Sequence, residues 1–302
     1  MRLAGRTLVM LVGLVAGSGC YKDALAPMAD LAPARVLLTD SPFPFSLVDR
    51  VEVYVSQIAA SMAADTLPEA QRWVIIAEPR RRFEFLALQQ GDTALAGEGQ
   101  LPLGAYQAVR MTVNGDSSDV VLHDGRTARV RWPAAGELVL PAVVEQPIVV
   151  SDAGASIVLD FDVGRSFGYN LDPLFDFVFA PVLRAVRADS TGWLTGTVRG
   201  DSDGDGVPQP IADAIVTVYR GNALATSASW WVVATGRTQA DGDYTVAYLP
   251  PGAYIVRLET LWSARLGAIT MPDVLIGVGA GSRLDVTLPG VAAASRASHR
   301  SF

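Results

Sequence analysis

The chain has 302 residues, of which 50% are apolar and 18% are charged, and its formal net charge is −7. This apolar content suits about two folded domains, while the acidic balance disfavours nucleic acid and anionic lipid headgroups as partners. Cys20 is the only cysteine, which excludes intramolecular disulfides.

The first twenty residues have the pattern of an export signal. Arg2 and Arg6 form a basic start, residues 8–16 are all apolar or Gly, and small residues precede Cys20. The segment resembles a bacterial lipoprotein signal. This resemblance implies that residues 1–19 are removed and that Cys20 carries a lipid, which would attach the protein to a membrane.

Some features near the cysteine leave alternatives open. Gly17 stands where lipoprotein signals usually have an aliphatic residue, and ordinary secretion with cleavage after Ser18 or Ala26 is an alternative. A transmembrane helix needs ~20 apolar residues, and the apolar run is far shorter. Tyr21 directly follows the cysteine, at the position where an Asp would resemble an inner-membrane retention signal. The outer membrane is therefore the favoured location if the source is Gram-negative.

Residues 20–33 have two prolines and no period, and we interpret them as a tether. From there to residue 188, apolar residues alternate with polar ones in short segments, which predicts a first β domain at 34–188. Asp124-Gly125 predicts a two-residue hairpin turn, because Gly tolerates a positive φ. Asp160 and Asp162 alternate with apolar residues, which predicts a solvated strand face that explains them more simply than a functional carboxylate pair.

A second β pattern follows a short polar linker at residues 189–193. Strand-like segments recur at short spacing through residues 194–290, and residues 291–302 have the composition of a flexible tail. We therefore predict an all-β protein of two β-sandwich domains, immunoglobulin-like or transthyretin-like.

Two similar hexapeptides occur, one in each predicted domain. Residues 101–106 read Leu-Pro-Leu-Gly-Ala-Tyr, and residues 249–254 read Leu-Pro-Pro-Gly-Ala-Tyr. Pro and Gly predict a tight turn into a strand, with the Tyr covering the core end and its hydroxyl meeting the backbone. Either a duplication or the reuse of one turn solution explains the repeat.

Two family resemblances accompany these motifs. Residues 36–42, 51–55, 101–106 and 159–162 resemble, in order and spacing, the family called domain of unknown function 4382, whose members are exported and have no assigned activity. Residues 192–290 resemble the carboxypeptidase regulatory-like, transthyretin-type sandwich through Gly196, Val198, Asp241-Gly242, Tyr244 and residues 249–254. The second resemblance implies an adhesion, assembly or carbohydrate-contacting accessory without catalytic function.

An acidic loop is the candidate metal site. Asp201, Asp203 and Asp205 alternate with Ser and Gly, as in a Ca²⁺ loop, because this hard cation prefers oxygen ligands. Ala212 stands at the twelfth position of the loop, counted from Asp201, where a bidentate Glu is the usual ligand. Gln209 and Asp213 are the candidate replacements for that ligand. An ordinary acidic linker loop is the alternative.

Trp230 and Trp231 are the candidate ligand-binding residues. Neighbours in a strand point to opposite faces, so one of the two rings should be exposed and could stack on a sugar or fill a partner's pocket. A role of both rings in covering the core is the alternative.

His123 is the residue that a hydrolase would most need, since the other histidine, His299, lies in the tail. It adjoins the predicted hairpin turn, and an exposed turn residue is the simpler interpretation. Residues 80–82, three arginines, could touch anionic lipopolysaccharide or a partner's acidic groups, or simply form an exposed loop.

The sequence as a whole predicts a lipid-anchored protein of the cell envelope with a non-catalytic binding or scaffolding role. Its expected partners are the membrane, through the anchor, and an envelope protein or glycan. The alternatives are a carbohydrate-binding accessory that uses an exposed Trp, and an envelope hydrolase that uses His123. The only cofactor expected is structural Ca²⁺.

Overall fold

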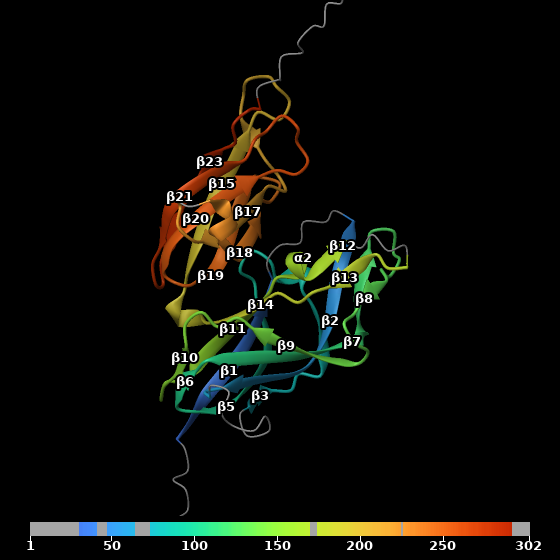
Figure 1. The fold of residues 1–302 in the computed structure, drawn as a ribbon, viewed down its shortest axis with the longest axis vertical. Coiled ribbons are helices and arrows are strands. Elements are labelled where there is room, and N and C mark those ends of the chain that lie inside the picture. Colours follow the sequence, from blue (N-terminus) through green and yellow to red (C-terminus); the bar gives the residue numbers. More distant parts are fainter. Residues whose placement is uncertain (1–29, 41–46, 64–72, 170–173, 225, 292–302) are drawn as a thin grey trace, which may run out of the picture.

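The structure, a computed structural model, describes residues 30–40, 47–63, 73–169, 174–224 and 226–291. Within these ranges nearly all regular structure is β, in two bodies that follow one another along the chain (Figure 1). The predicted all-β class with two sandwich domains is confirmed. The blue start of β1 (Leu31–Thr39) lies at the lower end of the view, and the second body occupies the upper end.

One sheet of the first body has the strand order β14-β11-β1-β5. Its other strands are β5 (Ala94–Pro102), β11 (Ala155–Phe161) and β14 (Leu183–Arg187). β1 pairs in parallel with β11 and antiparallel with β5. It begins at Leu31, inside the segment that the sequence suggested as a tether. Pro33 is tolerated there because pairing with β11 starts only at Ala34, so its missing N–H costs no bond on that side.

The opposing sheet has the order β3-β2-β7-β9, with β4 paired to β2. The strands are β2 (Val48–Ser61), β3 (Val74–Ala77), β4 (Arg81–Glu84), β7 (Ala108–Leu122) and β9 (Glu137–Ala142). Two small sheets pair β6 (Gly104–Tyr106) with β10 (Ile148–Val150), and β13 (Phe177–Phe179) with β8 (Val130–Arg131) and β12 (Phe167–Tyr169). A one-turn helix, α2 (Val163–Ser166), directly follows β11.

The core of the first body lies between these sheets. Alternate residues of β1 and β2, such as Val36, Leu38, Val51 and Val53, are fully buried, as period two requires. Phe85 and Phe161 meet edge to face, with ring centroids 5.1 Å apart. This core extends along the chain from Ala32 to Ala185.

The second body is a sandwich with its own core, which runs from Leu194 to Leu288. One sheet contains β15 (Gly192–Gly200), β16 (Gln209–Pro210), β19 (Asp243–Leu249), β22 (Gly281–Arg283) and β23 (Val286–Thr287). The other has the order β18-β17-β20-β21, formed by β17 (Ile215–Arg220), β18 (Trp231–Arg237), β20 (Gly252–Glu259) and β21 (Ile269–Ile276). A one-turn 3-10 segment at Ala188–Ser190 links the bodies.

The two hexapeptides form the same local structure. The Tyr106 hydroxyl donates to the Pro102 carbonyl at 2.9 Å, and the Tyr254 hydroxyl donates to the Pro250 carbonyl at 2.5 Å. Both rings are buried, and each motif's Gly has a positive φ that L side chains rarely adopt. The prediction that the Tyr covers the core end while its hydroxyl meets backbone is confirmed in both bodies.

In the described ranges, no helix is long and apolar enough to cross a membrane.

Candidate functional site

The two bodies meet at a polar contact, here called the seam, which joins Gln90, Asp162 and Arg184 of the first body to β18 and β19 of the second. The Gln90 amide donates to the Arg237 carbonyl at 2.7 Å and accepts from the Thr245 N–H at 2.8 Å. Arg237 and Thr245 lie on different sheets of the second sandwich. One side chain from the first body therefore connects the edges of both sheets.

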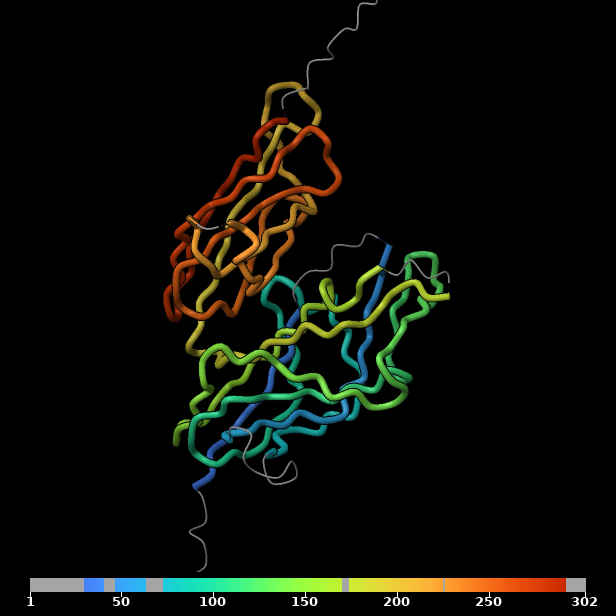
Figure 2. The backbone as a smooth tube through the Cα atoms, viewed as in Figure 1, coloured from blue at the N-terminus to red at the C-terminus, as the bar shows by residue number. Residues whose placement is uncertain are grey.

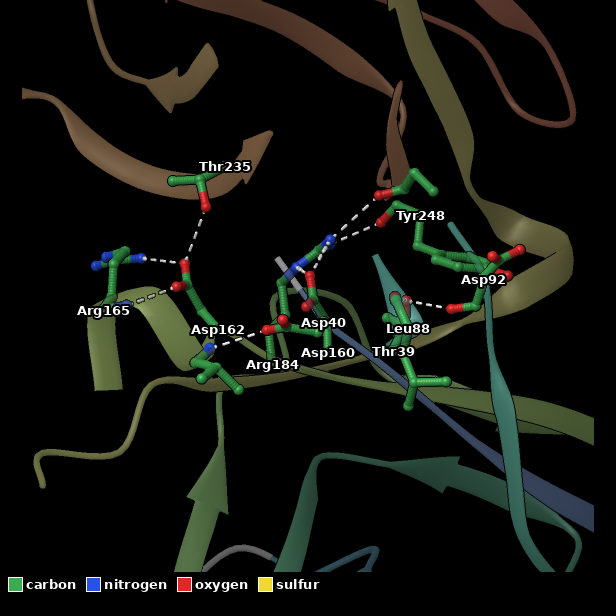
Figure 3. A network of polar contacts seen from close by, with 12 residues as sticks. Thr39, Asp40, Leu88, Asp92, Asp160, Asp162, Arg165, Arg184, Thr235 and Tyr248 are labelled. Carbon is green, nitrogen blue, oxygen red and sulfur yellow. Dashed lines mark hydrogen bonds and ion pairs between the residues drawn. The ribbon is translucent and has the colours of Figure 1, made fainter. Parts of the chain in front are cut away.

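Arg184 forms the most buried ion pair of the seam. Its Nη2 lies 2.6 Å from the Asp160 carboxylate, and the two side chains are 12% and 5% exposed. The same guanidinium donates to the carbonyls of Tyr248, at 2.6 Å, and Ala247, at 3.2 Å (Figure 3). The ion pair within the first body thus binds the backbone of the second.

Asp162 lies beside this pair and begins α2. Its Oδ1 accepts the Arg165 N–H at 2.8 Å as an N-cap, and its Oδ2 accepts the Thr235 hydroxyl of β18 at 3.3 Å. Burial, together with the neighbouring Asp160 carboxylate, raises the pKa of Asp162 from 3.8 to about 7. Asp162 therefore carries a proton at a pH where exposed carboxyls are charged.

Asp40 completes the group of buried carboxyls. Its Oδ1 accepts the Val163 N–H at 3.0 Å, which ties the end of β1 to the start of α2 (Figure 3). Burial raises the pKa of Asp40 well above its usual range, although the Val163 hydrogen bond opposes this shift. Residues 39–40 and 159–162 both belong to the segments that resemble the family called domain of unknown function 4382. The hydrogen bond from Val163 to Asp40 brings these two segments together.

The solvated face predicted for Asp160 and Asp162 is wrong. Both residues are about 95% buried, with exposed fractions of 4% and 5%. The second body covers the face of β11 that the sequence pattern assigned to solvent, and Arg184 from the neighbouring strand β14 compensates the charge. The two-residue alternation correctly identified which residues share this face of β11, but it could not show that the second body covers the face.

Two cavities flank α2 at the seam. One, of about 290 Å³, lies between α2 and the outer face of β17 and β18, where Thr217 and Tyr219 line it. The other, of about 210 Å³, lies between β14 and the start of β18, where Trp231 lines it. Asp162, Arg165 and Val232 line both cavities, so α2 stands between them.

The two tryptophans have different surroundings. The Trp230 Nε1–H donates to the Asn222 carbonyl at 2.9 Å, and its ring packs against Tyr219 at 5.7 Å. Trp231 is 56% exposed and lines the smaller cavity. The expectation that one ring is exposed agrees with this geometry, whereas ligand binding stays a prediction.

The acidic loop brings together three of its candidate ligands. Carboxylate oxygens of Asp201, Asp203 and Asp205 lie within 4.8 Å of one another. Asp213 instead lies 2.6 Å from the Arg237 guanidinium. Ca²⁺ takes 6–8 oxygen ligands, so the three carboxylates fit the cation only in part and would need backbone or water oxygens besides.

The remaining predicted sites stand apart from the seam. A turn is present at the predicted place, but the Leu122 N–H donates to the Arg126 carbonyl, so the loop has three residues, 123–125, instead of the two predicted. His123 lies in this loop, and its exposed ring is 3.4 Å from Asp49. The arginines at residues 80–82 are exposed, and Arg82 pairs with Asp119 at 2.7 Å. Cys20 and His299 lie outside the described residues.

Sequence reasoning missed Asp40, Gln90, Arg165 and Arg184. Arg184 had no distinctive signal, because a charged residue between Leu183 and Ala185 in an alternating strand normally marks a solvated face. Gln90 had none either, since its role depends on a turn and on a partner domain.

Comparison with known proteins finds a family match within the first body. Residues 32–175 match the family model described as "Domain of unknown function (DUF4382)", which confirms that predicted resemblance. The carboxypeptidase regulatory-like assignment of the second body and the lipoprotein signal stay predictions. No curated protein matches the sequence.

Several solved structures are similar to the chain at low identity. The minor pilin GBS52 of Streptococcus agalactiae is 11% identical, with 86% of this chain and 97% of that chain covered, at a TM-score of 0.25. The N-terminal domain of the shaft pilin SpaA of Lactobacillus rhamnosus GG is 17% identical, with 33% and 94% covered, at 0.24. A Pseudomonas aeruginosa protein to which carbohydrate binding is provisionally ascribed is 15% identical, with 33% and 90% covered, at 0.22.

Proposed function

We propose that this chain is a lipid-anchored protein of the cell envelope that holds its second domain away from the membrane in a non-catalytic binding or scaffolding role. The observation that carries the proposal is the placement of the two bodies. The first described strand starts at one end of the molecule, and the second body lies at the opposite end (Figures 1 and 2). An anchor attached before β1 would therefore leave the second body farthest from the membrane.

The seam supports a scaffolding role because it fixes the angle between the bodies. The contacts of Gln90 and Arg184 reach backbone groups, which cannot change rotamer, on both β18 and β19. A display protein that must hold its tip at a defined distance benefits from such a junction.

The geometry of the titratable groups favours binding over catalysis. The carboxyls of the seam are occupied by Arg184, by main-chain N–H groups and by Thr235. His123 is exposed, lies 3.4 Å from Asp49 and lines neither of the two seam cavities. We therefore place the hydrolase alternative last.

The anchor proposal rests on Cys20 and on the chain between it and β1. Ten residues, 21–30, separate Cys20 from β1 and span at most ~35 Å when extended. This reach lets the first body stand close to the membrane without being embedded in it. The outer membrane is the proposed location if the source is Gram-negative.

The test is intact mass and detergent-phase partitioning of the protein made with its own signal, beside Cys20→Ser. We expect a diacylated or triacylated mass and partitioning into detergent, both lost in the variant. An unmodified chain cut after Ser18 or Ala26 contradicts the anchor. Protease accessibility on intact cells then tests the display, because cleavage should remove the second body before the first.

Glycan binding is the second candidate function, favoured by the exposure of Trp231 at the edge of a seam cavity. An indole that is more than half exposed retains an apolar surface that a sugar ring can cover.

A further inference from the structure

The two seam cavities have the small size and mixed chemistry of a site for a ring-shaped polar molecule. Their volumes of about 290 and 210 Å³ lie at or below the lower end of the ~300–1,000 Å³ range of drug-sized pockets. An extended peptide or a protein segment needs more length than either cavity offers. A molecule with a single ring matches the volume of each cavity better.

Apolar surface forms one part of each wall. Ile215, Tyr219 and Val232 line the larger cavity, and Trp231, Val143 and Leu183 line the smaller. Trp231 and Val143 are 56% and 64% exposed, so this apolar surface can be reached from solvent. The C–H face of a sugar ring is the part of a polar molecule that packs on such surface.

Polar groups form the remainder of the walls. The Asp162 carboxyl, 95% buried, lines both cavities, and Arg165 beside it is 39% exposed. Thr217 and Glu259 add a hydroxyl and a carboxylate to the larger cavity. Donors and acceptors are thus available around an apolar floor, as sugar hydroxyls require.

Two of the charges in the larger cavity are balanced within the protein. Arg237 pairs with Asp213 at 2.6 Å, and Glu259 pairs with Arg257 at 2.9 Å. Arg165 lies 3.7 Å from Asp162, which keeps its proton up to about pH 7, so this guanidinium is available as a hydrogen-bond donor. A ligand that paired with Arg237 or Glu259 would have to break an existing ion pair, which favours an occupant without net charge.

We propose that the seam cavities beside α2 bind a neutral saccharide, with one ring against the Trp231 indole and hydroxyls directed to Arg165 and the polar wall. This proposal specifies a ligand class for the proposed binding role, and it does not depend on the lipid anchor. Because residues of both bodies line the site, it exists only while the seam is closed.

The experiment uses the mature chain, residues 20–302, with Cys20→Ser to keep it soluble. Cellohexaose, hexa-N-acetylchitohexaose and mannohexaose are the neutral probes, and tetragalacturonate is the charged probe. Tryptophan fluorescence and calorimetric titration measure binding. We expect saturable binding of at least one neutral probe, weakened at least about tenfold by Trp231→Ala, which corresponds to about 1.4 kcal/mol.

Matched variants separate the cavity from the general surface. Trp262→Ala removes an indole that is 65% exposed, compared with 56% for Trp231, and that lines neither cavity, so it should leave binding unchanged. Arg165→Ala should weaken binding, and Arg283→Ala, at an exposed pair, should not. Far-ultraviolet circular dichroism checks that each variant is folded.

Three results overturn the proposal: no saturable binding of any neutral probe, equal binding by Trp231→Ala, or preference for tetragalacturonate. None of them alters the detergent partitioning of the wild-type chain. A failed glycan site and a failed anchor are therefore told apart.

Discussion

Arg184 and Asp160 form an ion pair that faces two domains at once. Their closest atoms are 2.6 Å apart, and the guanidinium also donates to two carbonyls of the second body. A buried charge is costly unless both partners remain, because neither can recover its water. The pair therefore makes the stability of the seam depend on residues of the first body's own sheet.

Replacing Arg184 with Met should destabilise the protein by about 3–5 kcal/mol, because Asp160 is left buried without its partner. Urea unfolding followed by fluorescence should show this loss together with separate transitions for the two bodies. Arg283→Met, which breaks an exposed pair, should cost at most about 1 kcal/mol. A single unshifted transition in Arg184→Met would contradict a structural role for the seam.

Stability should decline as pH rises from about 4 to 7. Asp162 keeps its proton in the folded state up to about pH 7, whereas the unfolded chain releases it near 3.8, so deprotonation favours unfolding. This group accounts for about 4 kcal/mol between those limits. Asp40, whose pKa is also raised by burial, acts in the same direction.

The measurement is the free energy of unfolding from pH 4 to 8 for the wild type and Asp162→Asn. The variant cannot ionise, so its stability should decline less over this interval. Asp160 and Arg165, which face Asp162 on either side, are kept unchanged in both proteins. An identical slope in the two proteins would show that Asp162 does not titrate in this range.

Removing either buried tyrosine hydroxyl should destabilise its own body. Tyr106→Phe leaves the Pro102 carbonyl without its donor, at a cost of about 1–3 kcal/mol. Tyr254→Phe should cost more, because the Tyr254 hydroxyl also accepts from Arg220 at 2.9 Å. Tyr169→Phe, which changes a side chain that is 55% exposed, is the control. Equal losses of unfolding free energy in all three variants would contradict a stabilising role of the shared motif.

Calcium should raise the melting temperature of the full mature chain if the acidic loop binds it. At a concentration 100 times the dissociation constant, binding adds about 2.7 kcal/mol to the folded state. Asp201→Asn and Asp203→Asn should abolish the shift, and EDTA should reverse it. Asp152→Asn, which changes an exposed carboxyl of the first body, is the control. If the melting temperature of the wild type does not shift with calcium, the segment is an ordinary acidic loop that does not bind the cation.

Short-range patterns predicted a large part of the fold. Alternation at Val51, Val53 and Val55 identified β2, and Asp124-Gly125 identified a turn, because both depend on neighbours a few positions away. The repeated Pro-Gly-Tyr motif predicted the bond from the tyrosine hydroxyl to backbone for the same reason. The acidic loop was equally visible, since its three carboxylates lie within five residues.

The seam could not be found this way. Asp40 and Val163 are 123 positions apart, and Gln90 meets Thr245 across 155 positions. Charged residues in an alternating strand normally mark a solvated face, because burial of an unpaired charge is costly. The assignment of Asp160 and Asp162 to solvent followed that rule and failed.

The sequence by itself determined the strands, the two sandwich bodies and the tyrosine turns, because backbone geometry and local side-chain alternation decide them. Only the tertiary structure decided which face of β11 meets water, since that depends on a second domain and on Arg184 from another strand. The same long-range packing places Trp231 and Arg165 beside shared cavities. Burial and electrostatics in this protein are properties of the assembled domains, whereas its strand pattern is a property of the chain.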